Sequence, residues 1–379
     1  MLKKLLGRIR ISLILCFAMI GLAFGIFIGE SRVQAAEDPV ISSMSVYKDV
    51  DYSFLKEFDF GGNTGYTPLL TYDTAEKLAG STDIRLKEGR YIRTLGYYEK
   101  GDFGGATYLI SSKAEEGCVE LANGLYANIL PDIYVDSDGT KWVFFSVKQF
   151  GAKGDGVNAD NVGINKAICA AGSYAATDDY DRGFAYIPAG EYRAADQIHM
   201  NTQNINLVGD GDDSVIFTDN DYRKDTDYYE HFFMSWYGEN LFLGNFRVEA
   251  RETDWTRYMR QMSLFYCNNV YLYQVNYYIP QEAWSGAFYE DKQYTNLTIY
   301  TGDKNITVDD CTMYQMSGTY RGANIGIMDF WSAGTENITI MNCELHDNAR
   351  DEQIGIFSRM NIAESYIKNV DLINNDIYT

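Results

Sequence analysis

Three stretches towards the end of the chain repeat one alternation of apolar and polar residues. Asn305–Met313 (NITVDDCTM) recurs at 337–345 (NITIMNCEL) and at 369–377 (NVDLINNDI), so the period is 32 residues twice. Each unit alternates for three or four positions, turns at Asn, Asp or Gly, and alternates again. This pattern predicts a strand, a tight turn and a second strand rather than a helix. Looser copies begin at Asn204, Asn240 and Asn269.

Units of this kind must stack, because one of them cannot bury its own apolar face. A period in the low thirties with short strands is typical of the coils of a parallel β-helix. The sequence therefore predicts an all-β solenoid over residues 146–379. A small β-rich domain over 36–145 is expected to precede it and to pack against its first coils. Because the pattern continues unchanged to Thr379, either a C-terminal truncation or a covering partner chain, as in a homo-oligomer, is expected.

Stacking the repeats creates columns of like residues. We interpret the first Asn of each unit as a turn former, although Asn305 and Asn337 also match the glycosylation pattern. Cys311, Cys343 and Asn375 share another repeat position, so they should lie about one strand spacing apart. A disulfide between the two cysteines is compatible with that spacing. We favour free, buried thiols that pack as small apolar groups.

The glycine-rich stretch FGAKGDGVNADN, which starts at residue 150, opens the repeat region. It lacks the spacing of a phosphate-binding loop and the closing Glu of an EF-hand. A strand over 145–150, a turn over 151–156 and a helix over 161–171 capped by Asp160 explain it without a ligand. Such a helix would cap the solenoid by covering the open core of its first coil. The residues expected to face inward are Val162, Ile164, Ala167, Ile168 and Ala171.

The first 35 residues form a segment of a different kind. Basic residues precede an uncharged apolar run over 11–29, and small residues precede Ala36. This order is typical of a secretory signal peptide cleaved after Ala35. A retained signal anchor is the alternative, because the run is nearly long enough to span a bilayer. The protein is therefore expected to be secreted or at the cell surface, with membrane contact only if the segment is retained.

Charge narrows the range of partners. The chain has a net charge of −21, and residues 1–35 carry five Lys or Arg and one Glu, so removing them gives −25. Such a surface repels nucleic acid, and an anionic substrate would need a locally basic site or a bridging metal. Five cysteines remain after cleavage, and no CxxC or HExxH motif is present. A disulfide scaffold and a structural zinc site are therefore not expected.

Three motifs in order carry a resemblance to a known family: FGAKGDGVNADN from residue 150, AYIPAGEYR from 185 and INLVGDGDDSVI from 205. They resemble the start of the pectate-lyase-like right-handed β-helix superfamily, in the branch of rhamnogalacturonase-like and epimerase-like domains with relatives in phage tailspikes. The resemblance covers residues 144–217, with weaker support to 379. It implies a right-handed helix and an extracellular polysaccharide that is hydrolysed, cut by β-elimination, epimerised or only bound. Where the family usually has two aspartates and a threonine, this chain has Ala159, Asp160 and Asn161, which leaves the fold prediction intact.

Catalytic motifs are sparse. Polygalacturonase-type hydrolases of the superfamily use NTD, DD, GHG and RIK motifs, and only Asp309-Asp310 is present, at a repeat turn where acidic residues are ordinary. The segments Ile325–Ile327 and Ile354–Ile356 look like equivalent strands of successive coils. Arg321 and Arg350 each precede the first Ile by four residues. We therefore expect the two guanidiniums to lie near one another.

The candidate catalytic residues are Arg321, Asp329, Arg350, Asp351 and Glu352. In an anionic-sugar site an Arg would hold a uronate carboxylate in a fork. In a lyase, as the resemblance implies, an Arg could serve as the base beside acidic residues that hold Ca²⁺, the one candidate cofactor. A surface salt-bridge cluster is the alternative that we favour. The candidate substrate-binding residues are His346, Trp331 and Trp284.

Two classes of function stay open. The first is a secreted polysaccharide-active enzyme, a lyase or a glycoside hydrolase, that works in a groove along the helix. The second is a non-catalytic cell-surface or appendage protein that binds glycan in the same groove. Carboxylates or Arg residues converging in one groove would favour the enzyme, whereas scattered charges with a broad aromatic face would favour the binder. The fold alone cannot decide, because one scaffold hosts many activities.

Overall fold

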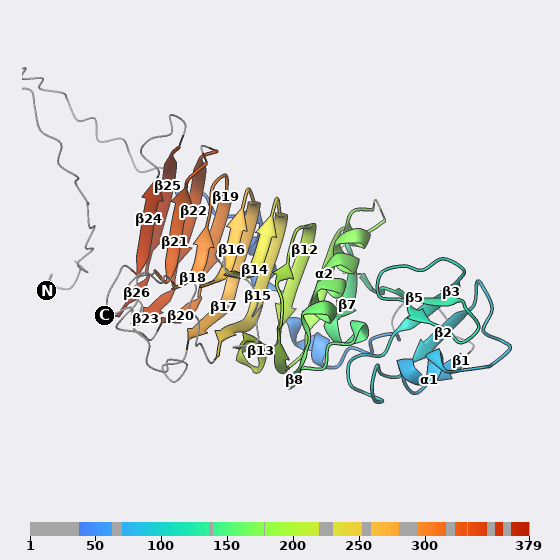
Figure 1. Ribbon diagram of the computed structural model, residues 1–379. Helices are drawn as coiled ribbons and strands as arrows, with labels where there is room; N and C mark the ends of the chain where they lie inside the picture. Colours follow the sequence, from blue (N-terminus) through green and yellow to red (C-terminus); the bar gives the residue numbers. More distant parts are fainter. Residues whose placement is uncertain are drawn as a thin grey trace, which may run out of the picture. The chain divides into compact units, whose positions relative to one another are not determined.

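The computed structural model describes residues 38–62, 70–135, 139–177, 179–219, 230–251, 259–279, 294–315, 323–331, 333–346, 353–358 and 365–378 (Figure 1). From residue 155 on, these residues form a parallel β-solenoid whose strands stack in sequence order, and a small β-sheet precedes it. The predicted fold class is therefore confirmed. The predicted signal segment lies outside the described residues. Within the described part, no helix combines the length and the apolar character that crossing a bilayer requires.

Each full coil has three faces, here called sheets A, B and C in chain order, and sheets A and B belong to one continuous 15-stranded sheet in the described part of the chain. Sheet A consists of β6 (Asp132–Val135), β7 (Lys141–Ser146), β9 (Arg182–Ile187), β12 (Gln203–Gly209), β15 (Glu239–Ala250), β17 (Asn268–Ile279), β19 (Lys304–Asp309), β22 (Thr335–Met341) and β25 (Ile367–Ile373). The strands β6 and β7 precede the first coil at the edge of sheet A, where β6 pairs antiparallel with β7. Sheet B consists of β8 (Asp155–Ala159), β10 (Gly190–Arg193), β13 (Ser214–Thr218), the second halves of β15 and β17, β20 (Thr312–Gln315), β23 (Glu344–His346) and β26 (Asp376–Ile377). Sheet C consists of β11 (Ile198–His199), β14 (Glu230–Trp236), β16 (Met259–Phe265), β18 (Tyr294–Ile299), β21 (Ile325–Asp329) and β24 (Ile354–Ser358).

Alternation along each strand builds the core. In β19 the side chains of Ile306 and Val308 are fully buried, and they stand in register with Ile338 and Ile340 of β22. Residues of one face repeat every second position in a strand, so the same columns recur from coil to coil. Each such side chain contributes about 1.5–3 kcal/mol by leaving water.

The first Asn of each repeat forms a ladder. Asn240 donates to Asn204 at 2.9 Å, Asn337 to Asn305 at 2.8 Å and Asn369 to Asn337 at 2.9 Å. Their backbones adopt left-handed conformations, with φ between 53° and 60°, which Asn tolerates better than most residues. The interpretation of these residues as turn formers is therefore confirmed.

A second left-handed column makes the corner between sheets A and B. Asn245 and Gln274 lie in the middle of β15 and β17, with φ of 59° and 51°, and the chain bends there from one sheet into the next. Asp310 and Asn342 occupy the same corner in the following coils, with φ of 54° and 55°. Next to this corner Cys311 and Cys343 are buried and form no disulfide, as expected for packed thiols, and their Sγ atoms donate to backbone carbonyls. Burial raises the pKa of Cys311.

The start of the solenoid differs in detail from its prediction. The strand predicted over 145–150 ends at Ser146, because Ser146 and Gln149 form a capping box that begins the 3₁₀ helix η3 (Val147–Phe150). The capping helix α2 (Asn161–Ala175) is four residues longer than predicted and packs against β7, β9 and β12. Four of its five predicted inward residues are buried, whereas Val162 is exposed.

Asp160 does not cap the helix with its side chain. Its carboxylate instead accepts hydrogen bonds from the backbone amides of Lys153 (2.7 Å) and Gly154 (3.0 Å), and so holds the glycine-rich loop against the helix start. Burial raises the pKa of Asp160 to about 6, against the two amide bonds, which favour the ionised form. The loop is therefore held by a carboxylate that is partly protonated in mildly acidic solution.

Residues 40–60, here called the strap, run along the outer face of sheet A across successive coils. The strap contains two 3₁₀ helices, η1 (Ser43–Asp49) and η2 (Tyr52–Lys56). The carbonyl of Val40 accepts from Thr339 in β22, and the amide of Ser42 donates to Thr307 in β19. Further along, Tyr47 packs on Phe242 and Phe184, and Phe54 packs on Phe144. The strap therefore contacts early and late coils alike, including two whose hydrogen-bonding residues are more than 250 positions away from it in sequence.

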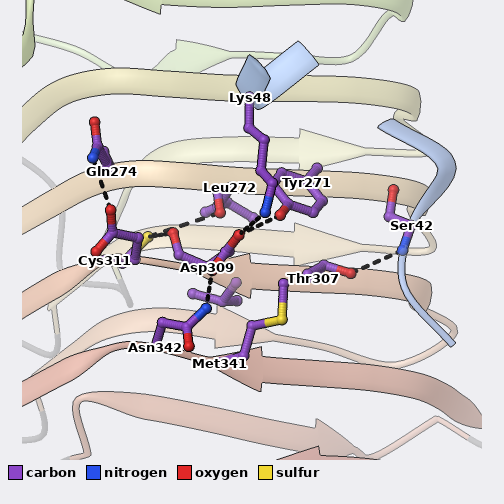
Figure 2. Close-up of polar contacts among 12 residues, drawn as sticks. Ser42, Lys48, Tyr271, Leu272, Gln274, Thr307, Asp309, Cys311, Met341 and Asn342 are labelled. Atoms are coloured by element: carbon purple, nitrogen blue, oxygen red, sulfur yellow. Dashed lines mark hydrogen bonds and ion pairs between the residues drawn. The ribbon is translucent and has the colours of Figure 1, made fainter. Parts of the chain in front are cut away.

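Asp309 is the polar anchor of the strap (Figure 2). Its carboxylate is 1 % exposed and accepts from Lys48 of the strap at 3.1 Å, from Tyr271 at 2.5 Å and from Asn342 at 2.7 Å. Three donors from the strap and two neighbouring coils compensate for the loss of hydration. Asp309 belongs to the one hydrolase-like motif found in the sequence, and its contacts in the fold are structural.

The N-terminal sheet precedes the solenoid with strand order β1-β2-β3-β5-β4. Its strands are β1 (Leu70–Tyr72), β2 (Tyr91–Thr94), β3 (Thr107–Ser111), β4 (Val119–Glu120) and β5 (Tyr126–Leu130), and α1 (Ala75–Ala79) packs beside it. Gln149 donates to the carbonyl of Gly105, and Tyr98 donates to the carbonyl of Gly151, so the region contacts the start of the solenoid. The domain boundary near residue 145 stays a prediction.

Candidate functional site

The outer face of sheet C is built by the same alternation that builds the core. Leu297 and Ile299 of β18 point into the core, and they pair in register with Ile325 and Ile327 of β21. The intervening residues therefore point outward. The register confirms that the segments around Ile325 and Ile354 are equivalent strands of adjacent coils.

A column of aromatic rings crosses this outer face. Trp236 stacks on Phe265 with ring centroids 4.4 Å apart, and Phe265 stacks on Tyr300 at 4.4 Å. Trp331 lies beside the column, with its centroid 6.0 to 6.5 Å from the other three rings. Trp331 is 51 % exposed, whereas Phe265 is 3 % exposed. The column is therefore a packed, largely buried stack, and Trp331 packs against it while about half of its own surface faces solvent.

More aromatic rings follow at the turn from sheet C to sheet A. Tyr237 stacks on Tyr266 at 5.2 Å, and Tyr237 is 65 % exposed. In the next coil Gly302 has φ of +79°, and a Cβ there would lie 2.5 Å from the ring of Tyr266. Gly334 (φ +72°) makes the same space for the ring of Tyr366. We call Trp236, Tyr237, Tyr266, Trp331 and Tyr366 the aromatic edge.

Polar side chains border the aromatic column. His231 Nδ1 lies 2.8 Å from the hydroxyl of Ser263, and its ring meets the edge of Phe265 at 5.4 Å. The guanidinium of Arg260 lies 5.2 Å from the ring centroid of Tyr300. Ser263 is fully buried and Arg260 is 7 % exposed, so these groups pack beside the aromatic column rather than facing solvent.

An amide ladder fixes the beginning of the sheet C strands. Gln261 donates to Asn296 at 2.9 Å, Asn296 donates to Asn324 at 2.6 Å, and Asn324 donates to Gln353. Asn324 and Gln353 immediately precede β21 and β24. The ladder therefore places the beginnings of these two strands side by side on adjacent coils.

The predicted catalytic residue Asp329 lies at the far end of β21 from that ladder. Its side chain is fully buried, and Oδ2 accepts from the backbone amides of Tyr366 at 2.8 Å and Gly334 at 3.3 Å. Ser365 donates to its carbonyl at 2.7 Å. Asp329 thus organises the turn that carries Trp331 and Tyr366, and its catalytic role stays a prediction.

The other predicted residues are divided between two parts of the molecule. Trp331 belongs to the aromatic edge. His346 lies on the outer face of sheet B, between the rings of Tyr314 and Tyr378, each centroid 4.3 Å away. The structure therefore brings Asp329 and Trp331 together but not His346. The residues that lie outside the described part are Arg321, Arg350, Asp351, Glu352 and Trp284.

No metal site is evident in the part of the chain that the structure describes, where no three His, Cys, Asp or Glu side chains come together. Near the aromatic edge the carboxylate of Asp303 is fully buried and accepts from the amides of Cys267 (2.8 Å) and Tyr300 (2.6 Å). Burial raises the pKa of Asp303. This group supports the turn beneath Tyr300 and is not exposed to a cation in solution.

Sequence reasoning missed most of the aromatic column. Trp236 and Phe265 each lie four residues before the first Asn of a repeat, and Tyr300 lies five residues before Asn305. An aromatic residue four or five positions before the repeat Asn was therefore the available signal. It becomes informative only once the repeats are stacked in register.

Comparison with known proteins places this architecture in a family. Residues 144–375 match the model of the family described as rhamnogalacturonase A/epimerase, pectate lyase-like. The chain belongs to this family. The comparison with curated proteins finds no match.

Several solved structures are similar to this chain at low identity. One is the tailspike protein of Acinetobacter baumannii bacteriophage Fri1, a capsular polysaccharide depolymerase (11 % identity, 82 % of this chain and 75 % of that chain, TM-score 0.38). Another is the tailspike of Acinetobacter phage vB_ApiP_P1 (13 % identity, 82 % and 60 %, TM-score 0.39). A third is the A-module of a mannuronan C-5 epimerase from Azotobacter vinelandii (14 % identity, 62 % and 76 %, TM-score 0.26).

Proposed function

We propose that this chain is a secreted polysaccharide-active protein that binds glycan along the outer face of sheet C. The observation that carries the proposal is the aromatic edge, in which exposed Trp331 and Tyr237 stand over a packed column of rings. Rings held in this way lose little side-chain entropy when a sugar stacks on them. Membership of a family named for a rhamnogalacturonase and an epimerase supports polysaccharide as the ligand.

The reaction that we propose is glycan cleavage, by β-elimination or hydrolysis. Arg321 and Arg350 each precede by three residues a member of the amide ladder, Asn324 or Gln353, whose strands pair on adjacent coils. This equivalence supports two guanidiniums facing one acidic sugar unit, with Asp351 and Glu352 nearby in sequence. One Arg would then bind the carboxylate of a uronate and the other would act as base.

A non-catalytic glycan-binding protein is the second candidate, and two carboxylates favour it. Asp303 and Asp329, which lie at the turns of the aromatic edge, are both buried and bonded to backbone amides. Hydrolysis of a glycosidic bond needs two carboxyl groups that reach the substrate. Neither of these two side chains meets that requirement.

An activity screen of the chain from Ala36 separates the candidates. Charged and neutral polysaccharides are offered with and without Ca²⁺, while reducing ends and the ultraviolet absorbance of unsaturated uronates are followed together. Absorbance that rises with reducing ends, and that Arg321→Gln or Arg350→Gln abolishes, is the result expected of a lyase. Reducing ends alone would indicate hydrolysis. Retention of glycan without any product would reject catalysis in favour of the binding protein.

A further inference from the structure

Three rings stack on the outer face of sheet B, apart from the aromatic edge. They belong to Tyr314 of β20, His346 of β23 and Tyr378, which directly follows β26, and they occupy one outward position in three successive coils. The imidazole lies between the two phenol rings, with each centroid 4.3 Å away and interplanar angles of 9° and 3°. Both faces of the imidazole are therefore covered. We call these three rings the His346 stack.

The edge of the imidazole, where its two nitrogens lie, is engaged differently from its faces. Nε2 lies 3.3 Å from a carboxylate oxygen of Glu344, which stands two residues earlier in β23. The side chain of Glu344 is 52 % exposed, and that of His346 keeps 16 % of its surface in water. A charged imidazolium is hydrated through its N–H groups. Stacking therefore covers the ring faces and leaves the edge that holds the charge beside a carboxylate and water.

The charged groups that face His346 from the described elements are acidic. Glu344 lies on its own strand, and Asp376 of β26 pairs in register with Glu344. β20 contributes only the phenol of Tyr314. Carboxylates titrate near about pH 4 and phenols near about pH 10, and the charge of Asp376 raises the pKa of Tyr378 further. Between pH 5.5 and pH 7.5 the imidazole is therefore the group among these that changes charge.

A positive charge on His346 strengthens the arrangement in two ways. A cation within about 6 Å of the face of an aromatic ring is attracted to it, and the imidazole has such a ring on each face. The charge also turns the contact with Glu344 into an ion pair, in a chain with a net charge of −21. Both attractions belong to the protonated form. They add to the stability of the coil in mild acid and are lost as pH rises and the ring becomes neutral.

The His346 stack is tied to sheet C through the amide ladder. Nδ2 of Asn324 donates to the carbonyl of His346 at 3.2 Å, and Nε2 of Gln353 donates to the carbonyl of Tyr378 at 3.1 Å. The amide of Tyr378 donates to the carbonyl of Leu345 at 2.9 Å, which joins the last two described coils. Fraying of β26 would therefore break contacts on both sheets, and the stacked rings oppose that fraying.

We propose that the His346 stack is a pH-sensitive clamp, which holds β26 against β23 more firmly in mildly acidic than in neutral solution. His346 senses the pH. The rings of Tyr314 and Tyr378 and the carboxylate of Glu344 respond to its charge. The clamp acts on the last described coils and does not depend on the proposed function.

Hydrogen exchange of the chain from Ala36, read by mass spectrometry on the peptide that contains β26, tests the clamp. Exchange at pH 5.5 and pH 7.5 is compared after correction for the intrinsic pH dependence of amide exchange. In the parent, local opening of β26 should be about fivefold rarer at pH 5.5, the combined effect of two cation–ring contacts and one exposed ion pair. His346→Phe keeps a ring between the two tyrosines but carries no charge, so its opening should be the same at both pH values.

Glu344→Gln is a second variant, chosen because an exposed side chain can be replaced with little effect on the fold. It should keep part of the pH effect, which the two rings supply. Equal pH effects in the parent and in His346→Phe would overturn the proposal, because the group that senses pH would then lie elsewhere. More frequent opening of β26 at pH 5.5 than at pH 7.5 in the parent would overturn its sign. A full parental effect in Glu344→Gln would remove Glu344 from the clamp.

Discussion

Sheets A and C both carry stacked aromatic rings on their outer faces, and they differ in what covers them. On sheet A, Phe144 stacks on Phe184 at 4.5 Å, and Phe242 stacks on Tyr271 at 6.1 Å. On sheet C, Trp236 stacks on Phe265 at 4.4 Å. The ring geometry of the two faces is therefore alike.

The strap makes the difference. It places Tyr47, Tyr52 and Phe54 over the rings of sheet A, so that Phe184 and Phe242 are fully buried. On sheet C the stacked rings of Phe265 and Tyr300 are also buried, at 3 % and 7 % exposed, but Trp331 and Tyr237 of the aromatic edge are more than half exposed. Aromatic content alone therefore does not identify a binding surface, because the same stacked rings serve as core wherever another segment covers them.

The largest effect on stability is expected when a ring is removed from the outer face of sheet A, which the strap covers. Phe242→Ala should destabilise the fold by about 3–5 kcal/mol, because it removes a buried ring from between the strap and sheet A. Tyr237→Ala, which removes an exposed ring from the aromatic edge, should stay within about 0.5 kcal/mol of the parent. Urea unfolding of both variants measures the contrast. Similar losses would mean that both faces are structural.

A smaller effect is expected at the anchor of the strap. Asp309→Ala should cost about 2–3 kcal/mol, because it leaves Tyr271, Asn342 and Lys48 without their shared acceptor. Lys48→Met should cost less, because Lys48 is partly exposed. Unfolding of the two single variants and the double variant gives the coupling between them. A coupling near zero would show that Lys48 and Asp309 do not hold the strap together.

A third prediction concerns the start of the solenoid, where the raised pKa of Asp160 should make the free energy of unfolding depend on pH. Burial raises its pKa from 3.8 to about 6, so between these values the unfolded chain releases a proton that the folded chain keeps. The stabilising contribution is present below pH 3.8 and is lost as pH rises through 6, a change of at most about 3 kcal/mol. Asp160→Asn lacks this dependence. The stability of the parent relative to this variant should therefore fall between pH 4 and pH 7, and a constant difference would contradict the raised pKa.

The coils could be predicted because their evidence is local and repeated. The Asn residues at 32-residue intervals carry both the turn conformation and the ladder, so one pattern fixed the strands, the turns and the register. The pairing of Ile325 with Ile354 followed from the same alignment. That the Asp160 side chain would not cap the helix could not be foreseen, because its carboxylate accepts from two loop amides instead of from the helix start.

The strap could not be predicted, because no local pattern in residues 40–60 indicates which distant residues it contacts. The hydrogen bonds of Ser42 and Val40 join residues 265 and 299 positions apart. Only part of the candidate site was recognised from the sequence, because its other residues also come together only through contacts distant in sequence. Trp331 stands out as a residue type, whereas Phe265 and Tyr300 become a column only when sheet C is assembled.

Glycan affinity of Trp331→Ala, measured beside its melting temperature, tests most directly the claim that the exposed aromatic edge of sheet C is the functional surface. Tyr98→Ala is the matched control, because Tyr98 is 50 % exposed and belongs to the N-terminal region. We expect Trp331→Ala to lose about tenfold in affinity for the polysaccharide that the parent binds, the value of one stacked ring, with an unchanged melting temperature. Parent-like affinity in Trp331→Ala, or an equal loss in Tyr98→Ala, would contradict the account.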